Sequence, residues 1–83
     1  MILELKKFGT TLTSRQDGRE ALAAINPQLQ SVALDEEIII DFTGVVTFTP
    51  SWADEFITPI KKEFKKRVIL RKTSNPSVKA TLD

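Results

Sequence analysis

The 83-residue sequence contains no cysteine and no histidine. The absence of cysteine excludes disulfide bonds, thiolate zinc sites and cysteine nucleophiles, and the absence of histidine excludes catalysis or metal binding by imidazole. No apolar run approaches the roughly 18 residues of a membrane span, and the opening residues MILELKK lack the order of a signal peptide. We therefore expect a cytoplasmic protein with no cofactor, no metal and no membrane contact.

The composition that is present is that of one small globular domain. Hydrophobic residues make up 41% and charged residues 28% of the chain, which is typical of a folded domain. A chain of this length holds a single core, so we expect one domain over residues 1–83. The net charge is only +1, but residues 1–55 hold nine acidic and four basic side chains, whereas residues 61–72 hold seven basic and one acidic.

Short apolar runs alternate along the chain with segments of helical periodicity. Strands are predicted at residues 2–8, 38–42 and 68–70, and helices after Ser14, from Ser51 to Phe64, and at about 76–82. Residues 10–13 and 45–48 are further extended pieces, and the first of them is expected to fold back as a hairpin. The order β(β)-α-β-α-β-α predicts a small α/β domain with a mixed, mostly parallel sheet.

Local signals mark the element boundaries and the core. Ser14, with Asp17 three positions later, is typical of a helix capping box. Pro27 and Pro59 are expected to end or kink the first two helices, because each removes a helical hydrogen bond. Residues 38–42 read as a strand buried on both faces. The expected shared core includes four side chains: Ile39, Phe42, Phe56 and Leu70.

Two neighbouring motifs resemble a known family. Residues 39–45 read IIDFTGV, and residues 50–56 read PSWADEF. They resemble the signature of the STAS-like domains of unknown function, in which a strand ending in Asp-Phe precedes Gly-Val and then Ser-Phe-Ala-Asp-Glu-Leu at a helix start. Trp52 and Phe56 stand for the usual Phe and Leu. The resemblance covers nearly the whole chain, and residues 40–56 are its most specific part.

The resemblance implies a bacterial-type, non-enzymatic interaction module in regulation or signalling. The family is distantly similar to the anti-anti-sigma factors, in which an ATPase-fold kinase phosphorylates a Ser or Thr at the start of a helix, and to cytosolic domains of sulfate transporters. STAS-like domains are often encoded with, or fused to, histidine-kinase-type ATPase domains, so a domain of that type is the expected protein partner. The Asp-Ser-Ser-Gly of the regulators falls on residues 49–52, TPSW, where only the second Ser is kept.

The predicted partner-binding residues are Thr49, Ser51, Trp52 and Glu55. Ser51 is the candidate phosphoacceptor, because a helix N-terminus accommodates phosphate; its ordinary role would be an N-cap. Thr49 is a weaker candidate acceptor in the same loop. Trp52 is either an exposed docking anchor or a core residue on the stripe of Phe56.

No catalytic site is predicted from the acidic residues. Asp54 and Glu55 are adjacent on a helix and point about 100° apart, so they do not converge on one ion. Their ordinary role is to favour the helix dipole. Asp41, at the end of a strand, is expected to cap the turn at Thr43 and Gly44.

The basic segment 61–72 supports the alternative function. A cluster of this kind is ordinarily a solvated helix face, and it could also bind an acidic protein partner or nucleic acid. The residues of this alternative basic patch are Lys61, Lys62, Lys65 and Lys66.

Overall fold

The computed structural model describes residues 1–82 of the chain. The elements run in the order β1 (Ile2–Glu4), η1 (Leu5–Phe8), β2 (Thr11–Leu12), α1 (Arg15–Gln30), β3 (Ile38–Asp41), β4 (Thr47–Phe48), α2 (Pro50–Phe64), η2 (Lys65–Arg67), β5 (Val68–Leu70) and α3 (Pro76–Leu82), where η marks a 3₁₀ turn. The fold is therefore a small α/β arrangement with three α-helices and mostly parallel strands, which confirms the predicted fold class.

The main sheet has the order β1-β3-β5, and both of its strand pairs are parallel. The predicted N-terminal hairpin is wrong, because β2 pairs with β4 in parallel and forms a separate two-stranded sheet. Leu5, whose side chain is fully buried, is the first residue of the 3₁₀ turn η1. Because η1 follows β1 directly, the chain turns away from β1 before it can reverse into a hairpin. Gly9, with φ of 125°, redirects it toward β4.

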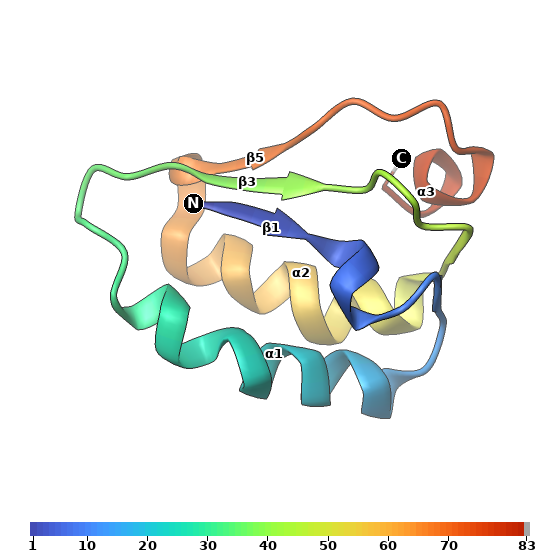
Figure 1. The fold of residues 1–83 in the computed structure, drawn as a ribbon, viewed down its shortest axis with the longest axis horizontal. Helices are drawn as coiled ribbons and strands as arrows, with labels where there is room; N and C mark the ends of the chain where they lie inside the picture. Colours follow the sequence, from blue (N-terminus) through green and yellow to red (C-terminus); the bar gives the residue numbers. More distant parts are fainter. Residues whose placement is uncertain (83) are drawn as a thin grey trace.

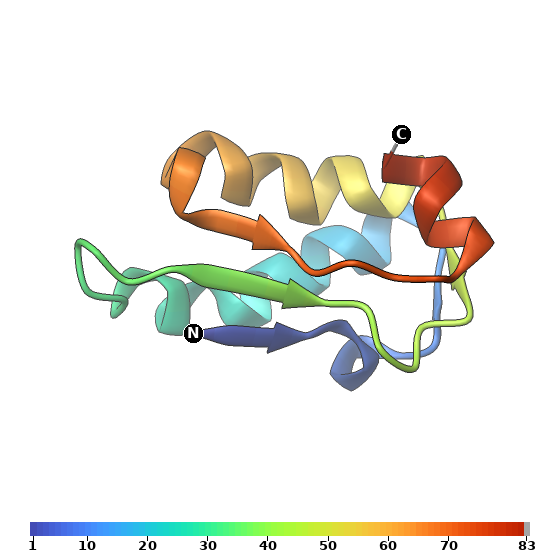
Figure 2. The ribbon, with the colours of Figure 1, turned by 90° about the horizontal axis from the view of Figure 1, so that it is seen from above.

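Both long helices cover the same face of the main sheet. Figure 2 looks onto the other face, which none of the helices in residues 1–82 crosses. The strands β1, β3 and β5 lie in the sheet in the same order as in the chain. α1 and α2 lie in the two connections between them, and right-handed connections in one direction place both helices on one side of the sheet. Leu3 and Ile40 point to the helices and are buried, whereas Ile2 and Ile69 are 54% and 39% exposed. The prediction that Ile38–Phe42 is buried on both faces is therefore wrong, and Ile39, in register with Ile2 and Ile69, lies on the open face outside the core.

The two prolines do not end their helices, and a kink, the other expected outcome, stays a prediction. α1 continues through Pro27 to Gln30, and α2 continues through Pro59 to Phe64, so neither proline ends its helix. Leu29 and Phe64 are buried beyond the two prolines. Their packing offsets one missing hydrogen bond in each helix, since tertiary burial supplies most helix stability. None of the helices within residues 1–82 is both long and apolar enough to cross a membrane.

The core is built around aromatic side chains contributed by α2. The ring of Trp52 stacks on Phe56 at 4.6 Å between centroids, and Phe48 and Phe8 pack against this pair at 5.8 and 5.4 Å. Phe42 is buried beside Phe48. Of the four residues predicted to share the core, Phe42 and Phe56 are confirmed as core residues, and Leu70 is partly buried against the core.

Candidate functional site

The start of α2 and the loop before it hold all four predicted partner-binding residues. Thr49 is the N-cap: its backbone is extended, and its carbonyl accepts the first helical hydrogen bond, from Ala53, at 3.1 Å. Its hydroxyl donates to the carbonyl of Thr13 at 2.8 Å, so this side chain anchors the loop to the segment after β2. The N-cap role predicted for Ser51 is wrong, because Pro50, whose fixed φ suits the first helical position, moves the cap upstream.

Ser51 is the second residue of α2 and is half-buried. Within residues 1–82 every fully buried side-chain oxygen has a hydrogen-bond partner. The hydroxyl of Ser51 forms no hydrogen bond in this part of the chain, so its oxygen is not fully buried. It lies in the first turn of α2, whose N–H groups have no partners inside the helix. The hydroxyl of Ser51 is therefore at least partly open to solvent.

Trp52, the next residue, points into the core. Its side chain is fully buried among Phe8, Phe48 and Phe56. The exposed-anchor interpretation of Trp52 is therefore wrong, and the core interpretation holds. Trp52 supports the candidate site by holding the first turn of α2 in place.

Asp54 and Glu55 are engaged by α1. Arg15 lies 3.4 Å from the carboxylate of Asp54 and 3.5 Å from that of Glu55, and Arg19 lies 3.6 Å from Glu55. The side chain of Glu55 is only 26% exposed. These ion pairs link the N-terminal halves of the two helices, so the acids align α2 against α1.

Gly18 sets the closeness of that contact, and the sequence analysis did not single it out. It is buried in α1, and a Cβ atom at this position would lie 2.8 Å from the backbone oxygen of Trp52 and 3.1 Å from Cβ of Glu55. Only glycine allows the two helices to approach this closely. The available signal was an isolated glycine inside a helical pattern, which often marks a packing requirement.

The loop after β3 begins with the predicted capped turn. The carboxylate of Asp41 accepts hydrogen bonds from the backbone N–H of Thr43 at 3.0 Å and from its hydroxyl at 2.8 Å. These two bonds, together with Arg71 at 3.1 Å, hold the pKa of Asp41 below its ordinary value. Gly44 follows with φ of 89°, a conformation that favours glycine. The expected role of Asp41 is thus confirmed.

The far end of the loop is fixed by the side chain of Asn75. Its side-chain amide donates to the carbonyls of Val45 at 2.6 Å and Val46 at 3.2 Å, while its carbonyl oxygen accepts from the N–H groups of Ser77 and Val78 at the start of α3. One side chain therefore caps α3 and ties it to the loop.

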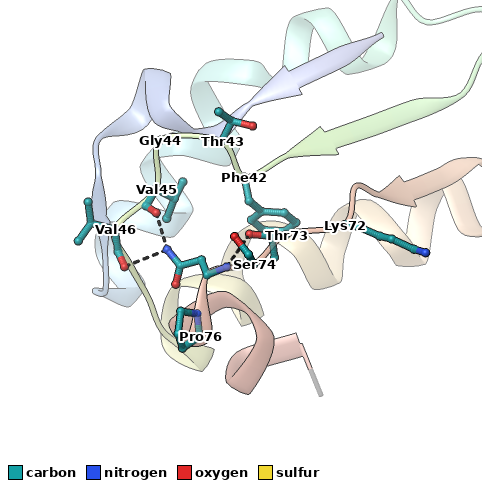
Figure 3. Close-up of a pocket in the computed structure, with 10 residues that line it drawn as sticks. Phe42, Thr43, Gly44, Val45, Val46, Lys72, Thr73, Ser74 and Pro76 are labelled. Atoms are coloured by element: carbon teal, nitrogen blue, oxygen red, sulfur yellow. Dashed lines mark hydrogen bonds between the residues drawn. The ribbon is translucent and has the colours of Figure 1, made fainter.

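A hollow of about 660 Å³ opens between this loop and the segment after β5. It lies at the carboxyl ends of β3 and β5, the usual position of ligand sites in open α/β sheets. The ring of Phe42 and the side chains of Thr73 and Ser74 are part of its lining, and Figure 3 shows Lys72 extending away from the loop. In the described part of the chain no three side chains gather that could hold a metal.

The basic segment does not form a single patch. Arg67 donates to the carbonyls of Ala33 and Leu34 at 2.7 Å each, and Arg71 pairs with Asp41. The lysines of the alternative basic patch remain exposed at the end of α2. In Figure 1 this end of α2 lies at the opposite end of the molecule from the loop after β3.

Comparison with family models identifies one match over residues 17–79, to the STAS-like domain of unknown function (DUF4325). Comparisons with curated proteins and with solved structures gave no match. The matched range contains both motifs on which the resemblance rested, together with most of α1 and all of α2, β3, β4 and β5. The chain belongs to the family of STAS-like domains of unknown function.

Proposed function

We propose that this STAS-like domain is a non-enzymatic interaction module of a regulatory switch, which docks a protein partner with a histidine-kinase-type ATPase domain. Its docking surface, here called the switch surface, consists of residues 43–50 and the first turn of α2. The observation that carries the proposal is an apolar side chain presented on a fixed loop: Val46 is 65% exposed.

The loop that presents Val46 is held from two sides. The N–H groups of Val46 and Thr47 donate to the carbonyl of Thr10 at 2.8 and 3.1 Å, and Asn75 binds the carbonyl of Val46. A loop that is already ordered loses little conformational entropy on binding, so more of the contact energy appears as affinity. Binding residues lie disproportionately on loops that a rigid scaffold positions, so an apolar side chain presented by such a loop is available as a contact residue.

Ser51 gives this surface a chemical means of switching. A phosphate on its accessible hydroxyl would lie in the first turn of α2, where unpaired N–H groups and the helix dipole favour negative charge. The same charge would oppose a partner that desolvates this helix end. The switch is therefore a change in partner affinity with little change in the fold.

The docking surface is tested by placing a photo-crosslinking residue at position 46 and recovering crosslinked proteins from the native host. The matched control carries the same residue at Leu34, which is 94% exposed in the loop at the other end of the sheet. We expect an ATPase-domain protein crosslinked at position 46 and not at position 34. Equal recovery at both positions, or recovery of no such protein, would refute the proposed surface.

The switch is tested by titrating that partner with Ser51→Ala and Ser51→Asp. We expect Ser51→Ala to keep most of the affinity and Ser51→Asp to lose it, while both remain folded. Equal affinities of the two variants would contradict a role for Ser51 and would place this helix end outside the interface.

The alternative function rests on the four exposed lysines Lys61, Lys62, Lys65 and Lys66, none of which forms an ion pair within residues 1–82. They would bind nucleic acid or an acidic partner. Binding to a phosphate backbone falls steeply with added salt, whereas an interface with apolar anchors changes little. Replacement of all four by Gln should leave partner binding intact if the switch surface is correct, and should abolish it if the basic patch is used.

A further inference from the structure

The strand β1 has a free edge with unused hydrogen-bonding groups. It lies at the margin of the main sheet and pairs only with β3 (Figure 1). The N–H of Ile39 donates to the carbonyl of Met1 at 2.8 Å, and Ile2 is in register with Ile39. In a parallel ladder the bonding residues alternate, so the N–H and C=O of Ile2 and the N–H of Glu4 point away from β3. This edge offers donors and an acceptor to another extended chain.

A groove runs beside this edge. It has a volume of about 240 Å³ and is bounded on one side by residues 2–4 of β1 and on the other by Ala24, Ile25 and Gln28 of α1, with Lys7 and Phe8 from η1 completing it. We call it the edge groove. Its walls are mixed: apolar residues such as Leu3, Phe8 and Ile25 lie beside Glu4, Lys7 and Gln28, and Ala24 contributes only a small side chain.

We propose that the edge groove binds an extended peptide carrying an acidic residue, which joins the sheet as an additional strand beside β1. The outward N–H and C=O groups of β1 are satisfied in this way by a peptide backbone. Ile2 and Glu4 lie roughly 6.6 Å apart along a strand, which is the two-residue repeat of an extended chain. Alternate side chains of the peptide would enter the groove, as in other strand-addition complexes.

Charge selects the acidic peptide. Lys7 and Glu4 both line the groove. The carboxylate of Glu4 already has Lys6 at 3.6 Å, whereas Lys7 forms no ion pair within residues 1–82. A carboxylate on the peptide would give Lys7 a partner at the rim of the groove, where the charge is not fully desolvated. Lys7 is therefore the residue that distinguishes an acidic peptide from a basic one.

A peptide fits this edge better than a second copy of the chain. β1 has three residues, so pairing between two copies would extend for only about 10 Å. A stable interface buries roughly 800 Å² on each partner, which so short a strand pair does not approach. A peptide, in contrast, contacts the strand edge and the wall of α1 together.

The edge groove is distinct from the switch surface, so the two proposals are tested separately. The test is selection of displayed nine-residue random peptides against the folded domain. We expect enriched sequences that alternate β-branched or aliphatic residues with polar ones and that contain an acidic residue. Enrichment of no sequence, or of sequences without an extended pattern, would overturn the proposal.

Three variants locate the binding site. Ala24→Glu fills the groove and should reduce the affinity of the selected peptide at least about tenfold, the size expected for losing one or two hydrogen bonds. Ala23→Glu is the matched control, since Ala23 is the neighbouring exposed residue of α1 but lines the side that faces α2; it should bind normally. Lys7→Glu should reverse the preference, so that basic peptides are selected. An equal loss of peptide affinity in Ala23→Glu and Ala24→Glu would show that the peptide does not bind in the edge groove.

Backbone pairing has its own signature. On peptide binding, hydrogen exchange of the Ile2 and Glu4 amides should slow, whereas that of the Ile39 amide, already bonded to Met1, should change little. N-methylation of the peptide should weaken binding at alternate positions only. Protection of neither amide would show that the peptide binds without strand addition. Formation of a dimer in sedimentation experiments without peptide, with Ile2 and Glu4 protected, would assign the edge to a second copy instead.

Discussion

Replacement of Gly18 by alanine is the sharpest test of how α1 and α2 pack. In an exposed helix position, Gly→Ala stabilises a protein by about 1 kcal/mol, because alanine loses less backbone entropy on folding. At Gly18 the added Cβ would lie 2.8 Å from the backbone oxygen of Trp52, and a backbone atom cannot rotate away as a side chain would. The gain in helix propensity would therefore raise the free energy of unfolding, whereas the clash with α2 would lower it.

The contact should outweigh the propensity gain. Overpacking a filled site costs about 1–3 kcal/mol, and here the whole of α2 must shift to relieve it. We expect Gly18→Ala to lower the free energy of unfolding by about 1–2 kcal/mol, which for a domain of this size lowers the melting temperature by roughly 4–16 °C. The shift would also move Glu55 away from Arg15 and Arg19, so the start of α2 should lose its alignment.

Thermal unfolding followed by circular dichroism measures the stability change, and the fluorescence of Trp52, the only tryptophan, reports the position of α2. The control is Ala23→Gly, at an exposed position of α1, which should lower stability by about 0.5–1 kcal/mol through helix propensity. If Gly18→Ala instead raised the melting temperature by the amount that Ala23→Gly lowers it, the close helix contact would be disproved.

Three further substitutions test the core, the helix start and the capped turn. Phe56→Ala should cost about 3–5 kcal/mol in chemical denaturation, since it removes a fully buried ring that stacks on Trp52; an unchanged midpoint would show that the core is assigned wrongly. Ser51→Ala should change stability by less than about 0.5 kcal/mol, because Thr49 and not Ser51 caps α2; a loss of 1 kcal/mol or more would restore the N-cap role. The hydrogen bonds from Thr43 lower the pKa of Asp41, so its stabilising contribution should be present at neutral pH and be lost as pH falls through the lowered pKa. Asp41→Asn should therefore be less stable than the parent at pH 7, and the difference should shrink in acid; a difference independent of pH would contradict the charge effect.

Features that depend on neighbouring residues were predictable from the sequence. The cap at Ser14, whose hydroxyl accepts from the N–H of Asp17 at 3.0 Å, and the turn at Asp41 each involve residues at most three positions apart. Residue type and spacing specify such hydrogen bonds directly. The order of strands and helices followed from hydrophobic periodicity in the same way, and this order indicated the α/β class.

Features of the candidate site were only partly predictable. The sequence placed Ser51 and Thr49 at the start of α2, but which of them caps the helix depended on whether Pro50 is its first helical residue. Periodicity placed Trp52 on the apolar stripe of α2, yet it could not say whether that position faces the core or a partner. The structure buries Trp52 because Phe8 and Phe48, from distant segments, close over it.

The amino-acid sequence by itself determined the local elements, their caps and the α/β class, because short-range hydrogen bonds and side-chain periodicity are encoded within a few residues. Only the tertiary structure decided that both helices cover one face of the sheet, which leaves Ile39 on the open side and β1 with a free edge. It also paired β2 with β4 and brought Gly18 against Trp52. These outcomes depend on contacts between residues about 35 positions apart in the chain, and such contacts form only when the helices and strands pack together.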